Sequence, residues 1–162
     1  MTTVIEPATG ADLSAVLAIN QACVPHVSSI PLEELRDLAR QACHFTVVRA
    51  DGKVVGFMLA LGPGQHYESL NYRWFSEHYG NFVYVDRIAF ASGFRGAGLG
   101  RKLYDHLERE YKGRVPVITC EVNLLPPNPD SLAFHKRLGF EEVGQQDTEG
   151  GRKRVSLLAK QL

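Results

Sequence analysis

The amino-acid sequence predicts an α/β fold, and three local patterns carry this prediction. Residues 84–104 read as a strand that turns through several glycines into a helix. The pair Asp51-Gly52 separates two β-rich runs, which is the pattern of a tight hairpin. Strand-like and helix-like segments alternate along 162 residues, a length that suits one domain, 1–162, with a sizeable core.

The segments of the first half follow from periodicity and from end signals. Thr9 and Asp12 form a variant of the capping box, so we expect a helix that starts there and ends before Pro25. Pro31 indicates the beginning of a second helix, because proline is favoured in the first turn. The other expected segments are a strand at 2–7, that second helix at 31–42, and hairpin strands at 44–49 and 53–61.

The stretch 62–80 is the least regular part of the sequence, and we expect a loop there. It is dense in aromatic residues, among them Tyr67, Tyr72 and Trp74. Long loops are often functional, so these three side chains are candidates for the wall or lid of an acceptor-substrate site. An aromatic cluster that only packs the loop, or a dimer contact, fits the same composition equally well.

The second half contains the strand of residues 84–104 and four further segments. Asn128 or Asp130 can cap a short helix, which Gly139 ends. A turn-rich loop precedes that helix. The expected segments are a helix from Leu99 to about 112, a strand at 115–122, a loop at 123–130, a helix at 131–138, and strands at 140–146 and 152–160.

Composition and charge narrow the classes of function. Lys+Arg and Asp+Glu number 18 each, so the net charge of zero favours neither nucleic acid nor a membrane as a partner. The start resembles no signal peptide, and no apolar run approaches the length of a membrane span. Cys23, Cys43 and Cys120 are few and widely spaced, which is typical of reduced thiols in a cytoplasmic protein. No metal site is expected, because neither C-x-x-C nor H-E-x-x-H occurs.

The glycine-rich turn has the chemistry of a phosphate site. A strand that turns into a helix presents backbone N–H groups at the positive end of the helix dipole. Glycines at 96, 98 and 100 lack Cβ atoms and let an anion approach the backbone, while Arg95 and Arg101 add positive charge. The turn therefore predicts a cradle for phosphate, most directly for pyrophosphate.

Three kinds of phosphate-binding turn compete for this segment. A P-loop is excluded, because Leu99-Gly100 stands where that motif needs Lys-Ser/Thr. A dinucleotide fingerprint fits at Gly96 and Gly98 but has Arg101 at its third glycine. Glu121 lies about twenty residues on, where a ribose-binding acid is expected. This partial match leaves a nucleotide-binding oxidoreductase as a minor alternative.

The third kind is the pattern R/Q-x-x-G-x-G/A, which residues 95–100 match at every specified position. This segment resembles the pyrophosphate-binding motif of the GNAT N-acetyltransferase superfamily. A second stretch resembles another motif of that superfamily: Asn128, then a short helix with Ser131 and His135, then Gly139-Phe140. With the order of the other segments, the resemblance covers most of the chain.

The resemblance implies a central mixed, mostly antiparallel sheet of six to seven strands, flanked by about four helices, with a splay between the two central strands. Acetyl-CoA, as cosubstrate, would lie in the splay, with its pyrophosphate on the glycine turn and its pantetheine arm along the strand before it. The residues implied to bind it are Ile88, Ala89, Phe90, Arg95, Gly96, Ala97, Gly98, Leu99, Gly100, Arg101, Asn128 and Ser131.

The implied activity is acetyl transfer to a primary amine, which attacks the thioester directly in a ternary complex. An ammonium must first lose its proton, and Glu121 is the first candidate base, with Asp86 the second. Asp86 can instead form a structural ion pair with Arg87. His135 stands where many members have a Tyr that protonates the leaving thiolate, and histidine can keep or lose that role. Asn123 is a candidate to bind the acceptor.

The partner is expected to be a small-molecule or peptide amine, whose identity the sequence leaves open. A homodimer is usual by resemblance. The missing Tyr keeps one alternative of a different class, a non-catalytic acyl-CoA-binding or sensor module on the same fold.

Overall fold

The computed structural model describes residues 2–162, over which the chain forms seven strands and five α-helices. The strands are hydrogen-bonded in the order β1-β2-β3-β4-β5-β7-β6. Strands β4 and β5 pair in parallel, whereas β1–β2, β2–β3, β5–β7 and β6–β7 are antiparallel. The prediction of a mixed, mostly antiparallel sheet is therefore confirmed.

The chain divides into two compact units, each assembled from two segments. Unit 1 consists of residues up to Leu61 together with Val85–Glu110. Unit 2 consists of Gly62–Tyr84 together with Tyr111–Leu162. Strand β4 (Val83–Phe90) contributes its first two residues to unit 2 and the rest to unit 1.

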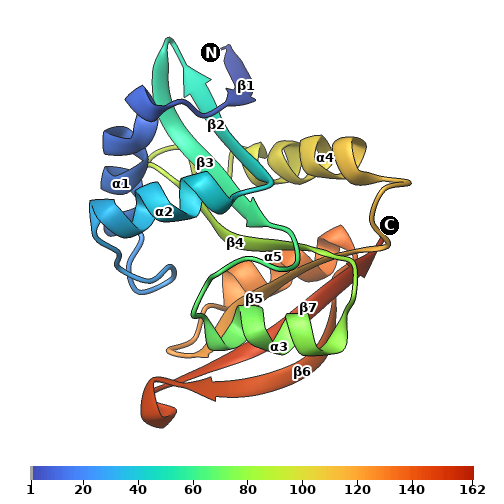
Figure 1. Cartoon of the computed structure of the whole chain (residues 1–162). Coiled ribbons are helices and arrows are strands. Elements are labelled where there is room, and N and C mark those ends of the chain that lie inside the picture. The colour runs from blue at the N-terminus through green and yellow to red at the C-terminus, as the bar shows by residue number, and fades with distance from the viewer. Residues whose placement is uncertain (1) are drawn as a thin grey trace. The chain divides into compact units, whose positions relative to one another are not determined.

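Unit 1 is built on three antiparallel strands, β1 (Thr3–Pro7), β2 (His44–Ala50) and β3 (Lys53–Leu61) (Figure 1). The hairpin between β2 and β3 turns at Asp51 and Gly52, whose φ angles are 50° and 81°. A two-residue hairpin turn of type I′ needs positive φ at both central positions, and Asp-Gly tolerates this best. The Asp-Gly signal therefore predicts this hairpin correctly.

Three helices cover the strands of unit 1. Helices α1 (Leu13–Ala22) and α2 (Leu32–Gln41) lie on one side of β2 and β3, and α4 (Leu99–Tyr111) lies on the other (Figure 1). The backbone N–H of Thr9 donates to the Asp12 carboxylate at 2.9 Å, which is the predicted capping contact, and a 3-10 turn (Gly10–Asp12) precedes α1. The apolar side chains that these helices bury are Val16, Ile19, Leu35, Leu38, Leu99, Leu103 and Leu107.

Unit 2 is built on β5 (Val117–Leu125), β6 (Glu141–Thr148) and β7 (Lys153–Gln161), with a 3-10 turn (Glu149–Gly151) between the last two. Strand β4 joins β5 through the pairs Val83↔Ile118 and Tyr84↔Thr119. The predicted loop at 123–130 is wrong at both ends, because residues 123–125 belong to β5 and residues 129–130 begin the next helix. Asn123 and Leu125 still pair with β7, on either side of a register shift, so β5 continues past Val122.

Helix α3 (Leu70–His78) is an element that the sequence-based reading lacks. The prediction of a loop over 62–80 is wrong for these nine residues. Ser69 caps the helix by accepting from the Tyr72 N–H, and Tyr72 and Phe75 form its buried side. Aromatic residues are weak helix formers, so the local signal is poor and packing on the sheet decides the structure.

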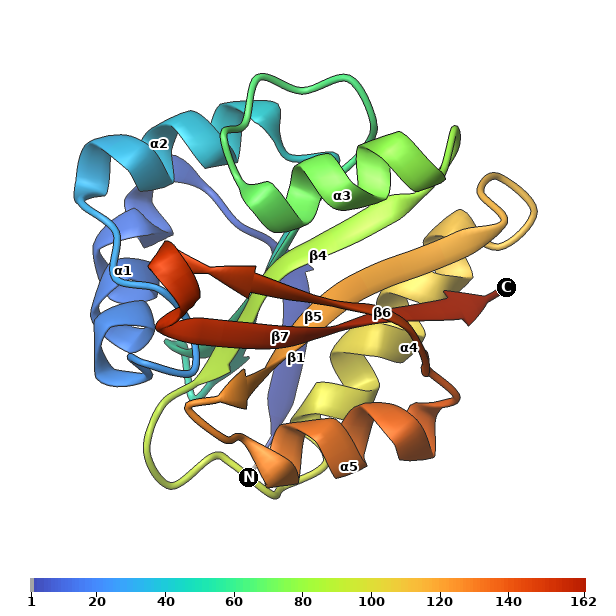
Figure 2. The same ribbon diagram turned by 90° about the horizontal axis from the view of Figure 1, so that it is seen from below.

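Helix α5 (Pro129–Leu138) lies on the opposite face of β5 and β7 from α3 (Figure 2). Asn128 is its cap and accepts from the Ser131 N–H, and Gly139 ends it with φ 101°. The left-handed conformation at Gly139 explains why glycine ends this helix. None of the described helices is long and apolar enough to cross a membrane.

Gly56 tests the packing of β3 against β4. A Cβ at this position would lie 2.4 Å from Cδ1 of Phe90 and 3.2 Å from the Ala89 carbonyl oxygen. We expect Gly56→Ala to lower the free energy of unfolding by about 1–3 kcal/mol, because the ring and a strand backbone must both move. Urea unfolding measures this. Gly80→Ala, where a Cβ meets nothing within 4 Å, is the control and should change stability little; equal losses in both variants contradict the contact.

Candidate functional site

The glycine turn between β4 and α4 has the backbone of an anion cradle. Gly93, Gly96 and Gly98 have φ angles of 88°, 76° and 79°, which strongly favour glycine. A Cβ at any of the three would meet nothing within 4 Å, so the turn is open above them. The first N–H groups of α4 have no acceptor within the helix, and Arg101 is exposed beside them. A diphosphate fits the chemistry of this turn.

Arg95 is a cradle residue whose side chain turns back toward the protein. Its Nη2 lies 3.1 Å from Sγ of Cys23, and its Nε donates to the Phe90 carbonyl at 3.3 Å. The Cys23 thiol also approaches the Phe90 carbonyl, at 3.5 Å. The arginine therefore braces the start of the cradle against the end of β4. No pattern in the sequence pointed to Cys23 as its neighbour, because the two residues lie 72 positions apart.

The residues of β4 predicted to hold the pantetheine arm differ in which edge of the strand their backbone N–H and C=O groups face. The Ala91 N–H donates to the Val55 carbonyl of β3 at 2.8 Å. Because neighbouring residues of a strand aim their amides at opposite edges, Ala89 also faces β3. Ile88 and Phe90 then present their backbone groups to the other edge. An extended ligand that pairs with β4 at that edge is served by Ile88 and Phe90 rather than by Ala89.

Asp86, the second candidate base, belongs to a buried polar cluster in unit 1. Its carboxylate accepts from Nε of Arg87 at 2.8 Å, and both side chains are 3% exposed. The same guanidinium donates to Oδ1 of Asn20 and to the carbonyl and hydroxyl of Ser28. Arg87 thus ties the segment between α1 and α2 to β4. Removing one partner of a buried pair is costly, so these contacts favour a structural role for Asp86.

Glu121, the first candidate base, is half-buried and held by side chains of unit 2. The Tyr84 hydroxyl lies 2.8 Å from both of its carboxylate oxygens, and Nδ2 of Asn71 donates to it at 3.1 Å. Gln146 donates in turn to Oδ1 of Asn71 at 3.0 Å. Hydrogen bonds to a carboxylate stabilise its ionised form. Sequence reasoning missed Tyr84, Asn71 and Gln146, which come from three different elements and show no common spacing.

The aromatic residues proposed as an acceptor wall fall into two places. The rings of Tyr67 and Tyr72 lie 5.7 Å apart, and Tyr72 lies 5.6 Å from Tyr84, so this group adjoins Glu121. Tyr72 is 3% exposed, and its hydroxyl donates to the Gly62 carbonyl at 2.6 Å. Tyr72 therefore shapes the segment from inside. Only Tyr67 of this pair is partly exposed.

Trp74 lies elsewhere on α3. It stacks on His78 with ring centroids 3.7 Å apart, and its ring would meet a Cβ at Gly144 of β6. Asn123 follows Glu121 by two residues on β5, so both side chains belong to the same face of the strand. The structure therefore places Asn123 with Glu121, and Trp74 against β6.

His135 lies on α5, on the opposite face of β5 from α3 and Glu121 (Figure 2). Its Nδ1 lies 2.7 Å from the Ser131 carbonyl, so Nδ1 carries the proton and donates. Burial lowers the pKa of His135, although the bond to Ser131 opposes this. A neutral ring with its proton on Nδ1 has none on Nε2, so this state cannot protonate a leaving group from Nε2. Asn128 and Ser131 are engaged in the first turn of the same helix.

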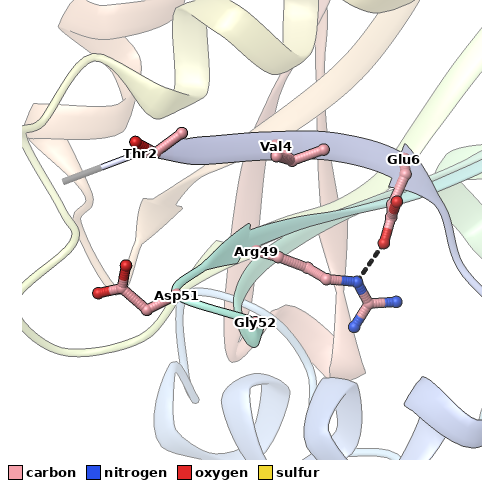
Figure 3. A pocket seen from close by; sticks show the side chains of 6 residues that line it. All are labelled: Thr2, Val4, Glu6, Arg49, Asp51 and Gly52. Atoms are coloured by element: carbon pink, nitrogen blue, oxygen red, sulfur yellow. Dashed lines mark hydrogen bonds and ion pairs between the residues drawn. The ribbon is translucent and has the colours of Figure 1, made fainter.

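A hollow of about 280 Å³ lies on β1 and β2, away from all the predicted site residues in sequence. Figure 3 shows its lining residues, with the Arg49 guanidinium turned to Glu6. Asp12 also pairs with Arg49 at 2.9 Å, and this hydrogen bond lowers the pKa of Asp12. Since its cation is already paired with two carboxylates, the hollow offers an anion little. The lining residues are Thr2, Val4, Glu6, Arg49, Asp51 and Gly52.

The sequence matches the family described as the Acetyltransferase (GNAT) family over residues 13–140. A search of curated proteins gave no match. Among solved structures, the chain is similar to ribosomal-protein-alanine N-acetyltransferase from Brucella melitensis. The identity is 29%, the TM-score is 0.72, and the likeness covers 98% of this chain and 99% of that chain.

Two further solved structures share the fold at lower identity. The ribosomal-protein-S18-alanine N-acetyltransferase of Escherichia coli is 20% identical, with a TM-score of 0.75 and coverage of 99% of this chain and 94% of that chain. NAA60 of Arabidopsis thaliana, solved with a bisubstrate analogue, is 18% identical, with a TM-score of 0.78 and coverage of 99% and 98%.

The buried, neutral state of His135 predicts a dependence of stability on pH. A histidine whose pKa is lower in the folded than in the unfolded chain binds protons preferentially when unfolded. Its contribution is therefore constant above the unfolded pKa of about 6.5 and is lost as the pH falls below that value. We expect His135→Gln to reduce the fall in stability between about pH 6.5 and pH 5, by up to about 1.4 kcal/mol per pH unit.

Urea unfolding at several pH values measures this slope. His44 also has a lowered pKa through burial, so part of the slope should remain in the variant. His66→Gln, at an exposed position, is the control and should leave the slope unchanged. A slope that is the same in His135→Gln as in the unchanged protein contradicts the assignment.

Proposed function

Because the chain belongs to the GNAT acetyltransferase family, we propose that it moves the acetyl group of acetyl-CoA to the α-amine of a peptide. The family uses acetyl-CoA, and the chain is a GNAT-type N-acetyltransferase, which removes the oxidoreductase alternative. The observation that carries the finer proposal is the half-buried Glu121 carboxylate, held by Tyr84 and Asn71. We propose that both units act together as one domain.

Unit 1 is proposed to hold the cosubstrate. The open glycine turn and the N-terminus of α4 are suited to the pyrophosphate, whose negative charge the helix dipole and Arg101 attract. Arg95 supports the turn from below through the Phe90 carbonyl. The backbone N–H and carbonyl of Ile88 and the N–H of Phe90 are proposed to pair with the pantetheine arm, since the Phe90 carbonyl is engaged by Arg95 and Cys23. An N–H at this strand edge would also stabilise the oxyanion that develops on the thioester oxygen.

Unit 2 is proposed to hold the acceptor. The amine nitrogen attacks the thioester carbonyl carbon, the C–S bond breaks, and CoA leaves as the thiolate. The amine proton passes to the Glu121 carboxylate and from there to solvent. The Tyr84 hydroxyl keeps the carboxylate in place, and Asn123 lies on the same strand face, where its amide can bind the acceptor chain. Tyr67 is the partly exposed aromatic that would contact its first side chain.

Two considerations support an α-amine over a lysine side chain. Of the three solved structures named above, the Brucella melitensis enzyme has the highest identity to this chain, at 29%. By its name, that enzyme acetylates an alanine of a ribosomal protein. A peptide α-amine has a pKa of about 7.7–8.0, against about 10.4 for lysine. At neutral pH the α-amine therefore needs far less free energy to lose its proton to a carboxylate.

The leaving group is proposed to depart without help from His135. The neutral ring donates its Nδ1 proton to the Ser131 carbonyl, so it is a positioning residue of α5 in this scheme. A thiolate is a fair leaving group, since free thiols have pKa values of about 8.5. The departure from the Tyr found in many members is then compatible with catalysis.

Gly98 tests the cradle. We expect Gly98→Val to abolish detectable CoA binding in calorimetry, because a side chain there fills the open space above the turn and shifts the backbone N–H groups. The variant also strains a position with φ 79°, so some stability is lost. Gly113→Val is the matched control: its φ is 84° and a Cβ there also meets nothing within 4 Å, but it lies at the other end of α4. The cradle is disproved if Gly98→Val binds CoA as the control does.

Glu121 tests the base and the acceptor together. Release of the CoA thiol is followed with a peptide that has a free N-terminal alanine, and with the same peptide acetylated at its N-terminus but carrying a lysine. We expect turnover with the free α-amine only. Glu121→Gln should lower kcat by about 10²–10⁴-fold, because proton removal is lost.

The same variant should bind CoA normally, since Glu121 is not part of the cradle. Glu141→Gln, an exposed residue of β6, is the control and should keep full activity. Turnover of the lysine peptide alone would overturn the α-amine proposal. Full activity of Glu121→Gln would remove Glu121 as the base, and CoA binding without turnover of any amine would favour the acyl-CoA-binding module.

A further inference from the structure

A cluster of metal-binding side chains lies in unit 1, outside every residue that the reaction uses. It consists of His44, at the start of β2, and of His106 and Glu110, one turn apart on α4. The ligand atoms of the three residues lie within 4.8 Å of one another. Nδ1 of His44 is 2.8 Å from Oε2 of Glu110, and the two imidazole rings are 5.5 Å apart.

The burial of these residues suits ligation. The His44 side chain is 2% exposed, so its ring is held in place at the start of β2. Nδ1 of His106 is buried and makes no hydrogen bond to any described residue. A buried ring nitrogen without a partner is unusual in a folded protein.

We propose that His44, His106 and Glu110 form a binding site for a divalent transition-metal ion of the zinc class. Two imidazoles and one carboxylate are a common ligand set for Zn²⁺, whereas Mg²⁺ and Ca²⁺ prefer oxygen ligands alone. Tetrahedral bonds of about 2.0–2.1 Å place ligand atoms about 3.3 Å apart, so atoms now within 4.8 Å need to close by about 1.5 Å at most.

The site is open to an ion from solvent through Glu110, whose side chain is 41% exposed. His106 and Glu110 occupy positions i and i+4 of a helix, so they share one face without any change of backbone. A bound ion would join the C-terminal half of α4 to the start of β2. The expectation of no metal site rested on sequence motifs, and this set escapes them because His44 is 62 residues from His106 along the chain.

The test uses the full chain without a polyhistidine tag, stripped with a chelator and dialysed. Co²⁺ is added first, because its visible absorption reports ligand number and geometry, and Zn²⁺ is then titrated by calorimetry. We expect one ion per chain, with Zn²⁺ displacing Co²⁺. The double variant His106→Gln/Glu110→Gln should weaken binding by at least about tenfold to a hundredfold.

The matched control is His66→Gln/Glu68→Gln, which removes the same two residue types from an exposed segment and should bind the ion as the unchanged protein does. Circular dichroism checks that both variants fold. In the unchanged protein, Zn²⁺ should also shift the imidazole NMR signals of His44 and His106 but not that of His66, a result that needs no variant. Absence of uptake, equal affinity in the two double variants, or an unshifted His106 signal would overturn the site.

Discussion

The left-handed backbone at Gly96 and Gly98 is the constraint on which the passage from β4 into α4 depends. The chain must leave β4 and enter α4 within a few residues, and it must do so with the first amides of the helix pointing outward. Side chains with a Cβ resist this conformation, and any such atom would also stand above the turn. The same two residues therefore satisfy the backbone geometry and leave open space at the turn. Arg95 ties the turn to the end of β4 through the Phe90 carbonyl.

Local signals in the sequence were sufficient to predict an element where its backbone conformation accepts only one or two residue types. Asp51-Gly52 indicated the hairpin, Gly139 the end of α5, and the glycine turn the start of α4, because each conformation admits few residues. For the start of α5 the sequence left Asn128 and Asp130 as alternative caps, and Asn128 is the cap in the structure. The stretch 62–80 failed for the opposite reason. The turn residues and aromatics around α3 carry a weak helix signal, and the burial of Tyr72 and Phe75 on the sheet supplies what the local sequence does not.

The candidate site likewise has one part that local sequence could predict and one part that it could not. The cradle is contiguous in sequence, so spacing alone could indicate it. The surroundings of Glu121 come from β4, α3, β5 and β6, and only folding brings Tyr84, Asn71 and Gln146 to one carboxylate. Sequence reasoning could name Glu121 as an acid on a strand but not its partners. It also named Asp86 as the second candidate base. In the structure, Arg87 binds Asp86 and also Asn20 and Ser28, which is the pattern of a buried structural ion pair.

The amide of Asn71 has a definite direction, because Gln146 donates to its oxygen while its nitrogen donates to Glu121. Gln146, Asn71 and Glu121 thus form a chain of hydrogen bonds that runs from the edge strand β6 to the carboxylate. Edge strands tolerate exchange of partly exposed side chains more readily than central ones. An exchange of Gln146 at this edge strand would therefore change the polar surroundings of Glu121 without altering a residue that contacts the carboxylate directly.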